Sequence, residues 1–308
     1  MATPDCDAFR AALTGPLAFP VTPFRDDMSL DADGLRRNLE RLLDSAPAAV
    51  VAAGGTGELY SLTPAEHREV VATAVGVCGR RVPVIAGVGF NARLAAEWSA
   101  EAARAGAAGL LAFPPYYPQA DEAGLFDYYE TIARATPLPV LIYSRDWFHP
   151  GPSFVERLAG LPQLVGWKDG QGDIRRLLAL MFRLGDRLHW IGGAGDDMVA
   201  AYYSIGIRAF TSSVSNISPR LARALHEHAA CAGHDPAHRD RLQELMKTLV
   251  VPLYALRARR RGYEVSVMKA LMNELGMAGG TVRPPLPRLA PEDLAALRAM
   301  VPAWRAAS

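Results

Sequence analysis

The chain is short of lysine, of cysteine and of long apolar runs, and each shortage excludes a class of protein or site. Its 33 basic residues include only three lysines, Lys168, Lys247 and Lys269, so arginine carries almost all of the positive charge. The three cysteines are odd in number and lack metal-ligand spacing, which favours a reducing compartment over a disulfide scaffold. No uninterrupted apolar stretch is long enough to span a membrane.

Concentrated charge of one sign is missing as well. The net charge is +1, charged residues make up 21% of the chain, and no long run has a single sign. Proteins that bind nucleic acid or anionic membranes concentrate basic residues, so neither partner is expected. The first 15 residues contain acids and no apolar segment of signal-peptide length, which predicts an unprocessed, cytoplasmic protein. With 308 residues and 50% hydrophobic content, the chain can form one large core or two ordinary domains.

Short apolar runs alternate with helical patterns over the first two thirds of the chain. We expect strands at residues 17–19, 49–53, 82–86, 109–113, 139–143, 164–167, 188–191 and 208–211. Two helix starts have capping signals: Asp31 is a candidate N-cap, and Thr63–Pro64 with Glu66 forms a candidate capping box. Eight strand–helix units spaced by roughly 25–30 residues are typical of an α/β protein with a (β/α)8 TIM barrel. A doubly wound open sheet fits less well, because the first strand–helix turn lacks a dinucleotide glycine fingerprint.

The last third of the chain shows only helical patterns. They cover residues 220–232, 236–259, 263–275 and 291–298. We therefore predict a barrel over residues 1–218, with its eighth helix running on to about residue 232, and a C-terminal helical extension over residues 233–308. No chemistry is recognisable in the extension, and Lys269 is interpreted as part of a helix that packs on the barrel.

Lys168 lies at the end of the sixth expected strand, in the segment VGWKDGQGD. Arginine cannot lose its proton near neutral pH, whereas a lysine desolvated in a pocket can, and it then becomes an amine nucleophile. Lys168 is therefore a candidate Schiff-base residue. A lysine in a surface ion pair is the alternative, and one lysine by itself does not decide between them.

Catalytic groups of such a barrel lie where its strands end. The residues at those positions are Gly55–Thr56, Tyr116–Tyr117, Tyr143, Arg145, Lys168–Asp169, the segment 193–197 and Ser212–Ser213. Arg145 could instead form a structural ion pair with Asp146 or Asp169. Asp196 and Asp197 have no histidine nearby, so we expect helix N-capping before Met198 and no metal site.

These motifs, taken together, resemble the pyruvate-dependent class I aldolase superfamily of dihydrodipicolinate synthase and N-acetylneuraminate lyase. The resemblance rests on GGTGE after the second strand, a tyrosine at the end of the fifth and a lysine at the end of the sixth. Within the superfamily, FPVTPF, IYSRD, GWKDGQGD and RRRGYEVSVMKA resemble the decarboxylating 5-dehydro-4-deoxyglucarate dehydratases. The synthases and lyases usually have a hydroxyl residue where Gly55 stands.

The resemblance implies a role for each matching residue. Lys168 would form the Schiff base, and Tyr143 would transfer protons with a phenol pKa lowered by the neighbouring cation. Thr56, with Gly55 beside it, would hold the carboxylate of the 2-oxo acid, and Arg145 would lie at the pocket mouth. Ser212 and Ser213 would contact substrate. Tyr116 and Tyr117 match in position a tyrosine that the synthases receive from a neighbouring subunit, and no catalytic role is assigned to them here.

The implied activity is that of a carbon–oxygen lyase that dehydrates and decarboxylates a small sugar acid without metal or organic cofactor. An aldolase or a pyruvate-condensing synthase of the same superfamily is the nearest alternative. A barrel that binds a keto acid without turnover is a more remote one. Relatives in the superfamily are usually tetramers, so a homo-oligomer, either a tetramer or a dimer, is expected.

Overall fold

Eight parallel strands close into a barrel in the computed structural model, which describes residues 5–308. The strands are β1 Gly15–Ala18, β2 Ala49–Ala52, β3 Val84–Phe90, β4 Gly109–Pro115, β5 Val140–Ser144, β6 Leu164–Asp169, β7 His189–Gly192 and β8 Ala209–Ser212. Each strand pairs with the next along the chain, and β8 pairs with β1 through Gly15 and Ala209. The predicted (β/α)8 barrel is therefore confirmed.

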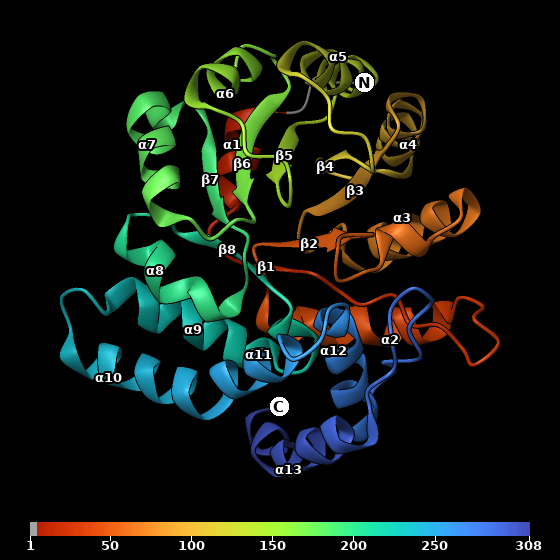
Figure 1. The fold of residues 1–308 in the computed structure, drawn as a ribbon, viewed down its shortest axis with the longest axis vertical. Coiled ribbons are helices and arrows are strands. Elements are labelled where there is room, and N and C mark those ends of the chain that lie inside the picture. The colour runs from red at the N-terminus through yellow and green to blue at the C-terminus, as the bar shows by residue number, and fades with distance from the viewer. Residues whose placement is uncertain (1–4) are drawn as a thin grey trace.

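A helix follows every strand, and these helices surround the barrel (Figure 1). They are α2 Ala32–Leu42, α3 Pro64–Cys78, α4 Ala92–Ala105, α5 Glu122–Arg134, α6 Pro152–Leu158, α7 Ile174–Leu184, α8 Val199–Ser204 and α9 Pro219–Cys231. The capping signals of the sequence are confirmed: the Asp31 side chain accepts from the Gly34 amide, and Thr63 and Glu66 form a reciprocal capping box.

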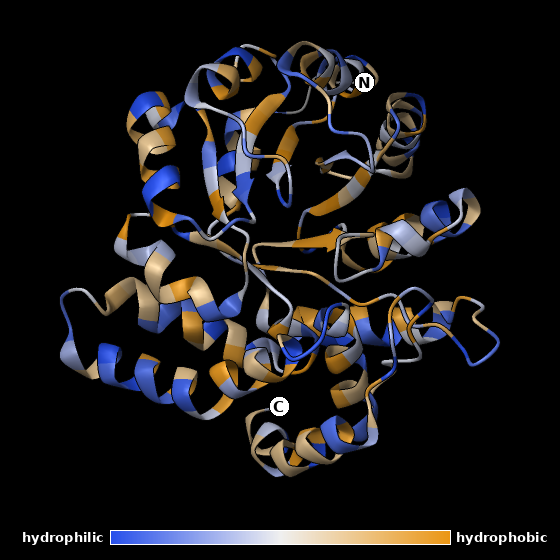
Figure 2. Ribbon diagram, viewed as in Figure 1, coloured by the Kyte–Doolittle hydropathy of each residue, from blue (hydrophilic) through white to orange (hydrophobic). Residues whose placement is uncertain are grey.

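The strands are buried on both faces, which explains why they occur in the sequence as continuous apolar runs and not as alternating patterns. Val50 and Val84 face the surrounding helices, whereas Val51 and Ile85 face the barrel interior. Burying such side chains stabilises the fold by about 1.5–3 kcal/mol each. In Figure 2 the apolar colour is concentrated on the strands and on the sides of the helices that face them.

A helix that the sequence patterns did not indicate precedes the barrel. α1 Cys6–Ala12 is capped by the Asp5 carboxylate, which accepts from the amides of Asp7 and Ala8. Phe9 and Leu13 are buried against the interior side chains at the N-terminal end of the barrel. α1 therefore covers this end of the barrel, and the cavity described below lies at the opposite, C-terminal ends of the strands.

The chain after α9 is helical and packs beside α8, α9 and the start of the barrel (Figure 1). It consists of α10 Pro236–Leu245, a π-helical turn at Met246–Val250, α11 Val251–Arg257, α12 Tyr263–Glu274 and α13 Pro291–Ala307. The single helix predicted for residues 236–259 is therefore interrupted by a π turn, and the last helix is longer than predicted. Over residues 5–308, no helix is both long and apolar enough to cross a bilayer.

Candidate active site

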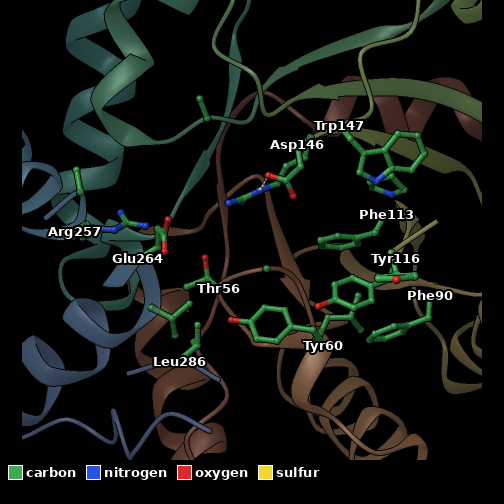
Figure 3. Close-up of a pocket in the computed structure, with 18 of the residues that line it drawn as sticks. Thr56, Tyr60, Phe90, Phe113, Tyr116, Asp146, Trp147, Arg257, Glu264 and Leu286 are labelled. Carbon is green, nitrogen blue, oxygen red and sulfur yellow. Dashed lines mark hydrogen bonds and ion pairs between the residues drawn. The ribbon is translucent and has the colours of Figure 1, made fainter. Parts of the chain in front are cut away.

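A cavity in two parts lies at the C-terminal ends of the strands. The inner part, about 60 Å³, reaches Lys168 and Tyr143. The outer part, about 550 Å³, widens toward the surface between the barrel loops and the C-terminal helices. Both parts share the residues at their junction, namely Gly55, Thr56, Arg145, Ala194, Tyr254 and Arg257. Figure 3 shows aromatic rings, including Tyr60 and Phe113, on one side of the outer part and Arg257 with Glu264 on the other.

Lys168 projects from β6 into the inner cavity, and its residue is only 3% exposed. Its Nζ donates to the Gly193 carbonyl oxygen over 2.9 Å and lies 3.2 Å from the centre of the Tyr143 ring. Burial, with a smaller contribution from the Arg145 charge, lowers the pKa of Lys168 well below its usual value, and Asp169 opposes the shift only weakly. Burial therefore favours the neutral, nucleophilic form of the amine.

The position of the Lys168 amine requires glycine at residue 193. A Cβ at this position would come within 2.7 Å of Lys168 Nζ and within 2.5 Å of the Asp169 carbonyl oxygen. Any side chain at residue 193 would displace the amine. At Gly55, by contrast, a Cβ would meet nothing within 4 Å, so this glycine leaves open space at the junction of the two cavities.

Tyr143 and Arg145 form a hydrogen-bonded pair at the end of β5. Arg145 Nη1 donates to the Tyr143 hydroxyl over 3.1 Å, and Arg145 Nε is 3.4 Å from an Asp146 carboxylate oxygen. Burial raises the pKa of Tyr143, and the Arg145 charge and hydrogen bond act against that rise. Before an iminium forms, desolvation of the phenolate outweighs the Arg145 cation. The expected lowering of the Tyr143 pKa concerns the iminium form and stays a prediction.

The loop after β2 places Thr56 at the cavity junction and buries Glu58 behind it. Glu58 has φ +53° and is fully buried, and its carboxylate forms an ion pair with Lys269 of α12. Lys269 Nζ also donates to the Thr281 carbonyl oxygen over 2.7 Å. The interpretation of Lys269 as a residue that joins a helix to the barrel is confirmed, and the structure adds that this residue is anchored to the GGTGE loop.

Only one of the two predicted serines reaches the cavity. Ser213 lines the inner part, where its hydroxyl accepts from Arg257 Nη1 over 2.9 Å. The Ser212 hydroxyl accepts instead from the Ser215 amide over 3.1 Å and belongs to the turn after β8. The strand alternation explains this difference, because neighbouring side chains of a strand point to opposite faces. Ser212 is therefore corrected from a substrate contact to a turn residue.

The expectation that Asp196 caps its own helix is wrong. The short helix there has no side-chain cap. Asp196 is fully buried, and its Oδ2 accepts from the amides of Ser213 and Val214, over 3.0 and 3.2 Å, and from the Tyr254 hydroxyl over 2.8 Å. It therefore joins the loop after β7 to the turn after β8 and to the C-terminal extension.

Three polar residues of the cavity wall come from the extension, where the sequence showed no chemistry. Tyr254 and Arg257 belong to α11, and Glu264 belongs to α12. Their contribution depends on how the extension folds over the barrel mouth, which no local motif reports. Within the described part of the chain, residues 5–308, no three histidine, cysteine or acidic residues gather as metal ligands would.

The fold and the cavity define a class: a (β/α)8-barrel protein with a buried lysine amine and a tyrosine phenol at the C-terminal ends of its strands. The family model of the dihydrodipicolinate synthetase family matches residues 12–303. The chain belongs to this family.

The comparisons also identify similar individual proteins. The chain is 39% identical over 291 residues to a probable 5-dehydro-4-deoxyglucarate dehydratase of Ralstonia nicotianae, covering 94% of this chain and 92% of the relative. It is 40% identical over 295 residues to a protein of the same name from Methylobacterium radiotolerans, covering 94% of each. Among solved structures, dihydrodipicolinate synthase from Oceanobacillus iheyensis is similar with a TM-score of 0.91 at 28% identity, covering 98% of this chain and 100% of that one.

Proposed function

We propose that the protein is a Schiff-base lyase that converts 5-dehydro-4-deoxy-D-glucarate to 2,5-dioxopentanoate, carbon dioxide and water. The observation that carries the proposal is the buried Lys168 amine at the floor of the cavity, beside a phenol and a guanidinium. The relatives at 39–40% identity are named probable 5-dehydro-4-deoxyglucarate dehydratases, which supports this substrate over those of the synthases.

Lys168 begins the reaction by attacking the ketone next to the substrate carboxylate. Loss of water from the adduct gives an iminium, which acidifies the neighbouring methylene and accepts electrons in the later steps. Tyr143 holds its proton at neutral pH, because burial raises its pKa, and it can therefore protonate the departing hydroxyl of the adduct. The resulting phenolate is stabilised by the hydrogen bond from Arg145.

Dehydration and decarboxylation then use the same electron sink. Tyr143 removes a methylene proton and returns it to the β-hydroxyl, which the electron pair expels as water, and this leaves an α,β-unsaturated iminium. The bond to the far carboxylate breaks next, and its electron pair moves through the double bond to the iminium nitrogen as carbon dioxide leaves. Protonation converts the resulting enol to an aldehyde, and hydrolysis releases 2,5-dioxopentanoate and regenerates Lys168.

Thr56 is proposed to hold the carboxylate next to the ketone. It lines both parts of the cavity, half-buried beside Gly55, where a hydroxyl and backbone N–H groups can donate to an anion. Arg145 is proposed to contact a substrate oxygen at the junction, and Ser213 to complete the inner wall. We further propose cytoplasmic localisation and a role in glucarate catabolism, in accordance with the composition and the substrate.

A homo-oligomer, either a dimer or a tetramer, is also proposed. Tyr116 and Tyr117 are 67% and 92% exposed at the rim of the outer cavity, and exposed aromatic side chains are enriched at protein interfaces. Sedimentation velocity is expected to give the mass of two or four chains. A single 33.2 kDa species over a wide concentration range would contradict this proposal.

The function is tested by incubating the protein with 5-dehydro-4-deoxyglucarate and following carbon dioxide, with borohydride trapping and peptide mapping in parallel. Carbon dioxide and an adduct on the Lys168 peptide are expected. Lys168→Ala should abolish both, whereas Lys247→Ala, which changes an exposed lysine, should leave both unchanged. An adduct without carbon dioxide would move the assignment to an aldolase or synthase of the family. Turnover by Lys168→Ala would exclude Schiff-base chemistry.

A further inference from the structure

Arg257 lines the active-site cavity although it belongs to the C-terminal extension and not to the barrel. It ends α11 and lines both the inner and the outer cavity, opposite the aromatic side of the outer cavity (Figure 3). Two contacts fix its guanidinium there. Nη1 donates to the Ser213 hydroxyl over 2.9 Å, and the guanidinium carbon lies 4.2 Å from the centre of the Tyr254 ring. The group is therefore held in place before any ligand binds.

The charge of Arg257 lacks a carboxylate partner in residues 5–308. None of the ion pairs of this part of the chain includes it, and its buried Nε has no hydrogen-bond partner. Asp197 and Glu264 line the same outer cavity, but neither comes within ion-pair distance of the guanidinium. Arg145, the other guanidinium at the junction, already contacts Asp146 and Tyr143. A buried donor without a partner costs stability unless a ligand satisfies it.

The inner cavity is too small for a whole substrate, so the two ends of a substrate must bind in different parts of the cavity. Its volume of about 60 Å³ is small beside the roughly 300–1,000 Å³ of ligand pockets, so the inner cavity can take the 2-oxo acid end only. The rest of a substrate bonded to Lys168 must pass the junction, where Arg257 lies.

We propose that Arg257 is a specificity-determining residue that binds the distal carboxylate of the substrate and so selects 2-oxo dicarboxylates over 2-oxo monocarboxylates. A guanidinium presents two parallel N–H groups that match a carboxylate, and Ser213 accepts only from Nη1 of the Arg257 fork. The C-terminal extension thereby takes part in substrate choice. The proposal rests on the proposed function in that it concerns the same cavity and the same Lys168.

The test compares, by calorimetry, two 2-oxo acids that can bind and form the Schiff base but cannot be dehydrated. 2-Oxoadipate has the carbon skeleton of the proposed substrate without its hydroxyls, so it cannot be dehydrated, and 2-oxohexanoate lacks only the distal carboxylate. The wild-type protein is expected to bind 2-oxoadipate roughly 10- to 100-fold more tightly, since a hydrogen-bonded charge pair contributes that much affinity. Arg257→Met should reduce the ratio to near one, and Arg257→Lys should retain part of it.

A matched control removes the same charge nearby. Arg261 is exposed, and Arg261→Met should leave the ratio at the wild-type value. Circular dichroism and the thermal midpoint of each variant report whether it is folded. A preference that survives in folded Arg257→Met, or a wild-type protein without any preference, would overturn the proposal.

Borohydride trapping of the same probes separates this inference from the proposed function. Arg257→Met should still form the 2-oxohexanoate adduct on Lys168 at the wild-type rate. Loss of adducts with both probes in the wild-type protein would exclude the Schiff-base function, whereas the calorimetric ratio would still decide the role of Arg257.

Discussion

Lys168 owes its reactivity to position. The chain also has a lysine that is exposed to water, Lys247. At the end of β6, Lys168 instead lies among Tyr143, Gly193 and other buried groups that exclude water and disfavour the ammonium form. Arginine could not substitute for it, because a guanidinium stays charged under these conditions.

The pH dependence of adduct formation should depend on Arg145. Only the neutral amine attacks a ketone, so the trapping rate rises with pH through the pKa of Lys168. The Arg145 charge lowers that pKa, and Arg145→Met should therefore raise it and move the acid limb of the profile to higher pH. The measurement is the borohydride trapping rate against pH. Arg175→Met, which removes an exposed charge from α7, should leave the limb in place; an unmoved limb in Arg145→Met would contradict this account.

Tyr143→Phe tests proton transfer without removing the ring against which Lys168 packs. We expect kcat to fall by roughly 10²–10⁴-fold, the usual contribution of a positioned acid–base group. Thermal stability should change little, because the buried ring remains and only its bond from Arg145 is lost. Carbon dioxide release and the unfolding midpoint, measured on the same samples, check both expectations. A variant that keeps its rate would show that another group moves the proton.

At the scale of elements, α12 and the loop after β2 stabilise each other through one buried ion pair. Lys269 of α12 forms its ion pair with Glu58, which follows Thr56 by two residues and adopts a left-handed backbone conformation. Burial lowers the pKa of Lys269 to about 8 and raises that of Glu58, so each charge relies on the other for stabilisation. The pair connects the C-terminal extension to the loop that carries the proposed carboxylate site.

Removing one partner of this pair should destabilise the protein strongly. Lys269→Met leaves the Glu58 carboxylate buried without its counter-charge and is expected to cost about 3–5 kcal/mol of unfolding free energy. The double variant Lys269→Met/Glu58→Gln removes both charges and should recover much of that loss. Chemical denaturation of the wild type, the two single variants Lys269→Met and Glu58→Gln, and the double variant gives the coupling between the two residues. Equal stability of Lys269→Met and the double variant would show that Glu58 does not need Lys269.

In the whole molecule, one buried hydrophobic cluster crosses the boundary that we predicted between barrel and extension. Val21 and Phe210 of the barrel side belong to the same buried cluster as Leu253, Met268 and Trp304 of the extension. Removal of the extension would expose an apolar face larger than soluble monomers usually tolerate. The division into residues 1–218 and 233–308 therefore describes the order of elements along the chain, and we expect one cooperative unit.

Truncation tests this expectation. A chain ending at residue 232 should fail to give a soluble folded barrel, since it loses the packing partners of α8 and α9. Full-length protein should unfold in one transition, with far-ultraviolet circular dichroism and tryptophan fluorescence coinciding. Solubility, circular dichroism and the denaturation curves provide the measurements. A soluble truncated chain with native secondary structure would show that the barrel folds by itself.

The barrel and the residues at its strand ends were determined by the sequence alone, because strand runs, caps and strand-end residues are local features. Lys168, Tyr143, Thr56 and Arg145 were all predicted from the strands that end beside them. The tertiary structure decided which residues from distant segments of the chain also line the cavity. Lys168 is carried by β6, but Arg257 reaches the same cavity only because α11 folds over the barrel mouth.

The same physical reason explains the corrections. Ser212 and Ser213 are adjacent in sequence, and the direction of each side chain, set by the end of β8, decides which one lines the cavity. The partners of Asp196 lie 17 and 58 residues away, beyond the reach of a local capping signal. Desolvation of Tyr143 and Lys168 likewise depends on what the closed barrel packs around them, since burial is a property of the folded chain and not of any motif.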